Sequence, residues 1–446
     1  MLDAQAAAGQ PGPRVALRRF GDPEALRVLP WGDEAVVARA RDVEEATQEP
    51  VLGGGMRMGE DEPEAHALGG RRRAGAQRLG HRAWDVGHQD AIGRGGARRR
   101  GERGEEQECA DDFSHAGLNE PKVGNMLGLR ARYVACVRNI PGTDLAVHPL
   151  CLGTNVFGWT ADESESFAVL DAYRAAGGNF VDTADGYSQW VPGNRGGESE
   201  EIIGRWMAKR GARDAIVVAT KVGSKSDRKG LTAENVRVAT EESLRRLQTD
   251  RIDLLYTHRD DEVTPPEETL AELDALVREG KVRHVAASNV SPERLEATMQ
   301  ASEREGLVRY VALQPHYNLV ERGYENGLAD VCRRHDLGCL PYFALAKGFL
   351  TGKYRPGADA VRSERAQGAG AYLDERGERV LAALDAAAAA HDVPVAATSL
   401  AWLAARPTVV SPIASARTPA QLAELMAMTD FELSADELRA LDDASA

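Results

Sequence analysis

The chain has 446 residues, of which 43% are hydrophobic and 28% are charged, and its formal net charge is −14 at pH 7. This excess of acidic residues argues against nucleic acid or an anionic membrane as the main partner. The sequence contains no apolar run long enough to span a membrane and no secretory signal at its start, so we expect a cytoplasmic protein.

The first 135 residues differ in composition from the rest. Residues 69–107 are rich in Arg, Gly and Ala, contain almost no Val, Ile, Leu or Phe, and show no helix or strand period. Such a segment cannot build a hydrophobic core. Its arginines would suit a nucleic-acid or partner-binding arm, but 20 basic and 22 acidic residues nearly balance up to Ala135. We predict that residues 1–135 form a disordered, low-complexity extension or a start-site artefact, with the functional chain beginning near Met126 or Val137.

From Val137 onward, short apolar segments alternate with amphipathic helical segments. Residues 139–147 predict a small hairpin that turns at Pro141 and Gly142. Strands are then predicted at 149–154, around 180–182, and at 215–221, 252–258, 282–288, 310–314, 338–342 and 409–413. Helices are predicted at 161–176, 199–210, 232–247, 266–279, 292–305, 324–335, 375–391, 395–406, 419–428 and 435–442. Thr160 and Glu163 have the spacing of a capping box for the first helix.

Eight apolar strands alternating with helices are typical of a parallel sheet that is covered on both faces. We therefore predict an α/β fold: a (β/α)8 TIM barrel with an N-terminal hairpin, over residues 137–446. In such barrels the active site lies at the C-terminal ends of the strands. Polar residues that end a predicted strand are therefore candidate site residues.

Four such residues suggest acid–base chemistry. Asp182 ends the second strand and Tyr187 follows it, while Lys221 ends the third strand and His258 the fourth. A lysine in the barrel mouth needs a counter-charge, which Asp182 would provide. The ammonium would lower the pKa of the Tyr187 phenol towards the working range of a proton donor, and His258 would orient a carbonyl oxygen. The alternatives are a structural Asp–Lys pair and a packed core histidine; Asp185 receives no role.

The chain from about residue 137 to the C-terminus resembles the aldo-keto reductase family. The motifs that carry the resemblance are, in chain order, NFVDTADGY, VATKVG, LLYTHRDD and GKVRHVAASN. The resemblance implies an NADPH-dependent oxidoreductase that reduces aldehyde or ketone carbonyls to alcohols. It also implies that Asp182, Tyr187, Lys221 and His258 form the catalytic tetrad, with Tyr187 as the general acid.

The resemblance further implies the positions that bind NADPH or NADP. Ser288, Asn289 and Gln314 would bind the nicotinamide carboxamide, and Tyr342 would stack on the nicotinamide ring. The other implied cofactor residues are Leu345, Gly348 and Lys353 near the pyrophosphate, and Ser415, Arg417, Gln421 and Glu424 near the 2′-phosphate and adenine. Two positions depart from the family pattern, because Phe343-Ala344 replaces Ser-Pro and Ser415 replaces a common lysine. Helix capping by Ser415 or Thr418, with Arg417 as a surface residue, is the alternative.

Substrate selection is expected to come from the loops over the barrel mouth. Trp190, three residues after Tyr187, would line the substrate pocket or pack on its own helix. The link after His258 is short and no long C-terminal loop is expected, which predicts an open pocket for a small-molecule carbonyl, sugar-type carbonyls included. Five scattered cysteines without CxxC spacing predict reduced thiols and no metal site. No sequence pattern specifies the oligomeric state.

Two other classes of function are compatible with these residues. One is a non-catalytic, NADPH-binding regulatory subunit of the same fold. The other is a Schiff-base lyase in which Lys221 attacks a carbonyl substrate.

Overall fold

The computed structural model of the protein describes residues 137–355 and 366–446. The predicted extension over residues 1–135 lies outside the described residues. All elements named below belong to the part of the chain that begins at Val137.

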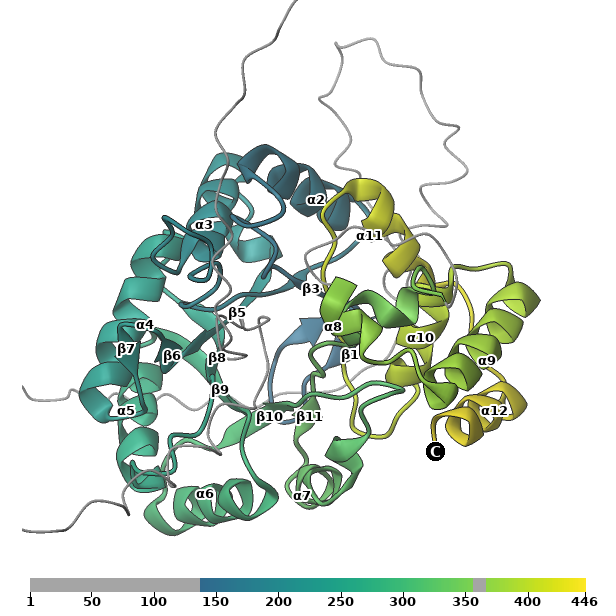
Figure 1. Cartoon of the computed structure of the whole chain (residues 1–446). Helices are drawn as coiled ribbons and strands as arrows, with labels where there is room; N and C mark the ends of the chain where they lie inside the picture. Colours follow the sequence, from purple (N-terminus) through teal and green to yellow (C-terminus); the bar gives the residue numbers. More distant parts are fainter. Residues whose placement is uncertain (1–136, 356–365) are drawn as a thin grey trace, which may run out of the picture. The chain divides into compact units, whose positions relative to one another are not determined.

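Eight parallel strands form one curled sheet with helices around it (Figure 1). The strands in sheet order are β11 (Gly338–Cys339), β10 (Tyr310–Gln314), β9 (Val282–Ser288), β8 (Ile252–Thr257), β5 (Val217–Val222), β4 (Phe180–Asp182), β3 (Cys151–Gly153) and β12 (Ile413–Ala414). A parallel bridge between Cys339 and Val409 joins the two ends of this order. The sheet is therefore closed into the predicted (β/α)8 barrel, and this prediction is confirmed.

Two hydrophobic clusters explain why the strands are apolar on both sides. Phe180, Ala219 and Leu254 belong to an inner cluster, whereas Val181 and Val218 belong to an outer cluster shared with the helices. Successive strand residues point to opposite faces, so each strand serves both clusters.

The predicted hairpin consists of β1 (Arg138–Asn139) paired antiparallel with β2 (Ala146–Val147). Its apolar residues Ile140, Leu145 and Val147 belong to the inner cluster of the barrel. The hairpin therefore packs against the N-terminal end of the barrel interior and leaves the C-terminal strand ends to the site.

The longer helices agree with the predicted positions within a few residues. They are α2 (Glu163–Ala175), α3 (Glu198–Arg210), α4 (Ala233–Leu247), α5 (Pro266–Arg278), α6 (Pro292–Glu305), α9 (Glu375–His391), α10 (Val395–Ala404), α11 (Pro419–Met426) and α12 (Ala435–Ser445). The capping box of α2 was assigned wrongly: Asp162 and Glu165 form it, not Thr160 and Glu163. Ala161 is buried and bridged to Phe157, which delays the helix start by two residues.

Glycine and proline explain two further differences, whereas the strand predicted over 409–413 is observed only as β12, Ile413–Ala414. The helix predicted over 324–335 is split into a 3-10 turn, Gly323–Glu325, and α7, Leu328–Arg334, because Gly327 between them has a φ of 100°. The strand predicted over 338–342 stops at Cys339, and Pro341 follows without a backbone N–H to donate. The small hairpin of β6 (Ser224–Lys225) and β7 (Arg228–Lys229) and the short α8 (Ala366–Gly370) were not predicted.

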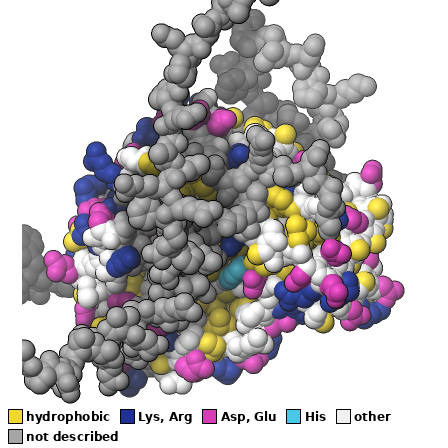
Figure 2. All heavy atoms as spheres, viewed as in Figure 1, with side chains coloured by type: hydrophobic (Ala, Val, Ile, Leu, Met, Phe, Trp, Pro, Cys, Tyr) yellow, Lys and Arg dark blue, Asp and Glu magenta, His cyan; other side chains and the backbone are white. Residues whose placement is uncertain are grey.

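Within the described residues, no single helix has the length and apolar character of a membrane span, although α9 and α10 pass that test as a pair bent by 97°. On the face seen in Figure 2, basic and acidic side chains are interspersed.

Candidate active site

The strand order brings the four predicted tetrad residues to one end of the barrel. Asp182 is the last residue of β4, Lys221 lies near the end of β5, and His258 directly follows β8. β4, β5 and β8 are consecutive neighbours in the sheet. Tyr187 lies in the turn after β4, where Tyr187 N–H donates to the carbonyl of Ala184.

Lys221 is the centre of the hydrogen-bond network. Its Nζ donates to Asp182 Oδ2 at 2.6 Å, to the carbonyl of Thr183 at 2.8 Å and to the Tyr187 hydroxyl at 2.8 Å. These bonds engage all three N–H donors of the ammonium. The side chains of Lys221 and Asp182 are 1% and 2% exposed, so each buried charge has its partner within the pair.

Tyr187 accepts this hydrogen bond, and its own hydroxyl donates a long hydrogen bond of 3.3 Å to Asp182 Oδ2. The expected lowering of its pKa is wrong for this arrangement. Burial and the Asp182 carboxylate together hold the pKa of Tyr187 well above 10. The ring is therefore a neutral phenol at physiological pH, and its proton is available for donation.

His258 is a neutral imidazole beside Tyr187. Burial and the positive charge of Lys221 lower the pKa of His258 to about 3. Its ring centroid lies 6.2 Å from that of Tyr187, and Nδ1 has no hydrogen-bond partner among the described residues. A neutral imidazole can donate one N–H, so His258 and Tyr187 can address the same acceptor atom.

The predicted nicotinamide-binding residues are connected to the tetrad. Gln314 Nε2 donates to Asp182 Oδ1 at 2.8 Å, and Ser288 Oγ donates to the Gln314 carbonyl at 2.8 Å. Asn289 has a φ of 49°, its Nδ2 donates to the His258 carbonyl at 2.8 Å, and its Oδ1 accepts from the Tyr342 hydroxyl at 2.8 Å. The structure thus brings Ser288, Asn289, Gln314 and Tyr342 together with the tetrad.

One face of Tyr342 is already stacked. The ring of His316 lies 5.3 Å from that of Tyr342 at an interplanar angle of 17°. Together with its hydrogen bond to Asn289, this stacking fixes the plane of Tyr342. The stacked pair was not predicted, since nothing in the sequence linked His316 to Tyr342.

The loop after β11 contains Leu345, Gly348 and Lys353 and has an unusual backbone. Phe343, Ala346 and Lys347 have φ values of 51°, 46° and 58°, which are costly for residues with a Cβ. Gly348 continues the series at 95°, and its N–H donates to the Leu345 carbonyl at 2.8 Å. Residues held in such conformations concentrate at ligand-binding sites.

Of the four residues predicted near the 2′-phosphate, Ser415 and Arg417 precede α11, and Gln421 and Glu424 lie within it. Thr418, not Ser415, is the N-cap of this helix, and Ser415 Oγ donates to Asn155 Oδ1 at 2.8 Å. Arg417 and Glu424 are exposed, and Gln421 Oε1 accepts from the Arg417 N–H at 3.0 Å. The contact between Asn155 and Ser415 was not predicted, because the two residues are 260 positions apart.

The structure shows two further groups near Tyr187 that the sequence analysis did not connect with it. Trp190 is half-buried, and its ring packs edge-to-face against Trp159 and Tyr187. Asp185 is buried, and neither of its carboxylate oxygens has a hydrogen-bond partner among the described residues. Sequence reasoning assigned no role to Trp159 or Asp185.

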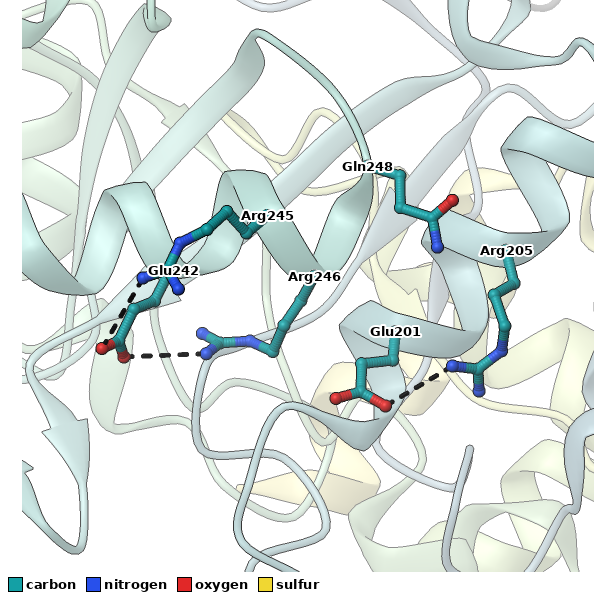
Figure 3. Close-up of a pocket in the computed structure, with 6 residues that line it drawn as sticks. All are labelled: Glu201, Arg205, Glu242, Arg245, Arg246 and Gln248. Atoms are coloured by element: carbon teal, nitrogen blue, oxygen red, sulfur yellow. Dashed lines mark hydrogen bonds and ion pairs between the residues drawn. The ribbon is translucent and has the colours of Figure 1, made fainter.

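A separate hollow lies between α3 and α4 (Figure 3). Its volume is about 360 Å³, and its lining residues are Glu201, Arg205, Glu242, Arg245, Arg246 and Gln248. Arg205 is paired with Glu201, and Arg246 with Glu200 and Glu242. Arg245 also lies 3.9 Å from Glu242, so each of the three arginines has an acidic neighbour, and none of the predicted site residues lines the hollow.

Comparisons with known proteins identify the family of the chain. The model of the aldo/keto reductase family matches residues 149–446. The chain is 32% identical to norsolorinic acid reductase A of Aspergillus parasiticus over 321 residues, covering 68% of this chain and 79% of the relative. It is 32% identical to protein tas of Escherichia coli over 330 residues, which cover 68% of this chain and 95% of the relative. It is 29% identical to an aryl-alcohol dehydrogenase of Pestalotiopsis microspora over 318 residues, which cover 68% of this chain and 80% of the relative. The chain therefore belongs to the aldo/keto reductase family and is an oxidoreductase.

Proposed function

We propose that the protein reduces aldehyde or ketone carbonyls to alcohols with NADPH, and that Tyr187 donates the proton. The observation that carries this proposal is the 2.8 Å hydrogen bond from Lys221 Nζ to the Tyr187 hydroxyl, at the C-terminal end of the barrel. Because the hydroxyl oxygen accepts from Lys221, its own proton points away from the ammonium, and it makes only the long hydrogen bond of 3.3 Å to Asp182 Oδ2. A carbonyl oxygen placed beside the hydroxyl would receive that proton as its negative charge develops.

The remaining tetrad residues have distinct parts in this proposal. The Lys221 ammonium stabilises the phenolate that remains after proton transfer, and Asp182 holds the ammonium in place at 2.6 Å. His258, neutral at working pH, donates an N–H to the carbonyl oxygen and so orients it towards Tyr187.

The residues at the neighbouring strand ends fit a nicotinamide cofactor. NADPH, when bound, supplies a hydride to the carbonyl carbon. Asn289 Oδ1 has a second lone pair, and with Gln314 and Ser288 it would hold the carboxamide, while Tyr342 would pack on the ring. The exposed Lys353, after the loop around Gly348, suits a pyrophosphate, and the exposed Arg417 before α11 suits a 2′-phosphate. These features favour NADPH over NADH.

The names of two relatives support this class of reaction. One is named a reductase and the other an aryl-alcohol dehydrogenase. Reduction of a carbonyl and oxidation of an alcohol are the two directions of one reaction. We further propose a cytoplasmic enzyme whose partner is a small-molecule carbonyl compound.

The Schiff-base alternative is less compatible with the site. An imine requires a free amine, but all three N–H donors of Lys221 are engaged, one of them by a buried carboxylate. Borohydride treatment in the presence of a carbonyl substrate would leave a covalent adduct on Lys221 only if the lyase assignment were correct.

The proposed function is tested by incubating the protein with NADPH and a panel of aldehydes and ketones. We expect NADPH absorbance to fall and the corresponding alcohol to form in equal amount, with NADH a poorer substrate. Tight NADPH binding without oxidation by any carbonyl would contradict the proposal and would favour the regulatory-subunit alternative.

A further inference from the structure

A buried carboxyl group that the proposed reaction does not use lies between two tetrad residues in the chain. Asp185 follows Asp182 by three residues and precedes Tyr187 by two. It is 1% exposed, and neither of its side-chain oxygens accepts a hydrogen bond from the residues that the structure describes. A buried carboxylate without donors is costly, whereas the uncharged acid avoids most of this cost. The surroundings of Asp185 therefore favour its protonated form.

The cations nearest to Asp185 already have carboxylate partners. Arg246 Nε, on α4, donates to Glu200 Oε2 of α3 at 2.6 Å. Lys225 Nζ, on β6, donates to the two carboxylate oxygens of Asp227 at 2.9 and 2.8 Å. Glu200 is itself fully buried. An ionised Asp185 would therefore add a second buried negative charge beside Glu200, with both cations already paired.

Asp185 changes its charge in a pH range where the tetrad does not. Burial and the Glu200 carboxylate raise the pKa of Asp185 to about 7, and Arg246, Lys225 and the Gly186 N–H oppose this shift. The pKa of Tyr187 lies well above 10 and that of His258 at about 3. A change in rate near pH 7 would therefore not come from the phenol or the imidazole.

The backbone around Asp185 connects it to the proton donor. The Asp185 N–H donates to the Lys221 carbonyl at 3.1 Å, and the Tyr187 carbonyl accepts from the Gly197 N–H at 3.1 Å. A Cβ on Gly196 would lie 3.1 Å from the Asp185 carbonyl oxygen, so this loop lies directly against the turn. The turn is thus fixed between β5 and the loop before α3. A displacement of Asp185 would be transmitted to the Tyr187 hydroxyl, which lies 2.8 Å from Lys221 Nζ.

We propose that Asp185 is a positioning residue whose carboxyl must be uncharged for the turn after β4 to hold Tyr187 against Lys221, so that ionisation of Asp185 slows the reaction. The inference rests on the proposed carbonyl reduction and adds to it a group that controls the proton donor without contacting the substrate.

The first test is the pH dependence of single-turnover oxidation of NADPH by benzaldehyde with the full chain. Asp185 is about nine-tenths protonated at pH 6 and about one-tenth at pH 8, so the rate of the wild type should fall about tenfold between these values. Asp185→Asn cannot ionise and should keep its rate within about twofold over the same range. Asp250→Asn, at an exposed position, is the matched control and should follow the wild type.

Lys225→Met tests the same carboxyl from its surroundings. Lys225 lowers the pKa of Asp185, so its removal should move the midpoint of the rate profile to higher pH. Its partner Asp227 is 64% exposed and remains solvated without it, so this variant should fold normally. It decides the question if Asp185→Asn fails to fold, as judged by circular dichroism and NADPH binding. An unchanged midpoint in Lys225→Met would count against the inference.

The second test needs neither cofactor nor substrate. The Trp190 ring lies 6.3 Å from the Tyr187 ring and reports on the turn by its fluorescence, taken as the difference between the full chain and Trp190→Phe. We expect a transition near pH 7 in the wild type and none in Asp185→Asn.

A wild-type rate that does not change between pH 6 and pH 8, or the same profile in wild type and Asp185→Asn, would overturn the inference and leave the proposed function standing. If no carbonyl compound is reduced, the proposed function fails instead, and fluorescence decides alone. Loss of the transition in Asp185→Asn then supports the positioning role, and the same transition in both proteins overturns it.

Discussion

At the level of single residues, one ammonium group organises the site. Lys221 joins the carboxylate of Asp182 to the phenol of Tyr187, and Gln314 extends the network from Asp182 to the next strands. The charge that positions Tyr187 is itself buried, so its loss should affect stability as well as activity.

Lys221→Met should therefore destabilise the protein strongly. Removal of the ammonium leaves the Asp182 carboxylate buried and uncompensated, which costs about 3–5 kcal/mol. Urea unfolding at pH 7 measures the effect. The double variant Lys221→Met/Asp182→Asn removes both charges and keeps an acceptor for Gln314, so it should recover much of the loss. An unchanged unfolding midpoint in Lys221→Met would show that another group neutralises the buried charge of Asp182.

Asp185 should make stability depend on pH. Burial and the neighbouring Glu200 carboxylate raise the pKa of Asp185 from 3.8 to about 7, while Arg246 and Lys225 oppose this shift. In the unfolded chain the carboxyl ionises near pH 4, so between about pH 4 and 7 the folded state binds the additional proton. This group therefore lowers stability as pH rises, by about 1.4 kcal/mol per pH unit, and the loss is complete above pH 7.

Asp185→Asn removes this titration. Its stability relative to wild type should increase by about 2–3 kcal/mol between pH 5 and pH 8, as measured by urea unfolding at both values. The exposed Asp250→Asn is the matched control and should show a much smaller change. A constant difference between Asp185→Asn and wild type at the two pH values would mean that Asp185 is ionised throughout.

At the level of elements, close helix packing supports the strands that carry the site. A Cβ on Gly204 of α3 would lie 2.3 Å from the Arg246 carbonyl oxygen and 2.7 Å from the Leu247 carbonyl carbon of α4. α3 also carries Glu200, which accepts from Thr220 of β5 at 2.5 Å. The spacing between α3 and α4 is therefore set by the absence of a side chain at Gly204.

Gly204→Ala should cost about 1–3 kcal/mol, because backbone atoms cannot yield as a side chain would. Thermal unfolding measures the loss. Ala208→Ser, at an exposed position of the same helix, should change stability by no more than about 0.5 kcal/mol. If both variants unfolded at the wild-type temperature, α3 and α4 would have to be farther apart than described.

Several elements could be predicted from local sequence and others could not. β9, β10, α6 and α9 have the predicted bounds, since apolar periodicity and the flanking Gly and Pro residues mark them. The start of α2 could not be predicted, because it depends on a bridge between Ala161 and Phe157 that the apolar periodicity of the helix does not indicate. The direction of the Tyr187 pKa shift depended on how deeply the phenol is buried and how close it lies to the Asp182 carboxylate, and both require coordinates.

At the level of the whole molecule, the barrel explains why residues far apart in sequence act together. Asp182 and Gln314 are 132 positions apart, yet their side chains are hydrogen-bonded because both end barrel strands. Because both residues end a predicted barrel strand, the sequence predicted that both belong to the site. It did not predict their mutual contact, since the strands β4 and β10 are not neighbours in the sheet.

A chain that begins at Val137 should retain the activity. The hairpin, all eight barrel strands and the tetrad lie in residues 137–446, and the family model matches residues 149–446. We expect kcat/KM of this shortened chain to lie within about threefold of the full chain, a difference below 1 kcal/mol. Loss of activity with normal circular dichroism would show that residues 1–136 contribute to the site.

Mass spectrometry of the natively expressed protein tests the start-site hypothesis, and N-terminal peptides from residues 1–100 would refute it.

The central claim is that Tyr187 donates the proton, and single-turnover oxidation of NADPH by benzaldehyde tests it most directly. Tyr187→Phe keeps the ring and removes only the hydroxyl that accepts from Lys221. We predict that the rate of the chemical step falls by about 10²–10⁴-fold, with NADPH affinity unchanged. Equal single-turnover rates in wild type and Tyr187→Phe would contradict the assignment of Tyr187 as the acid.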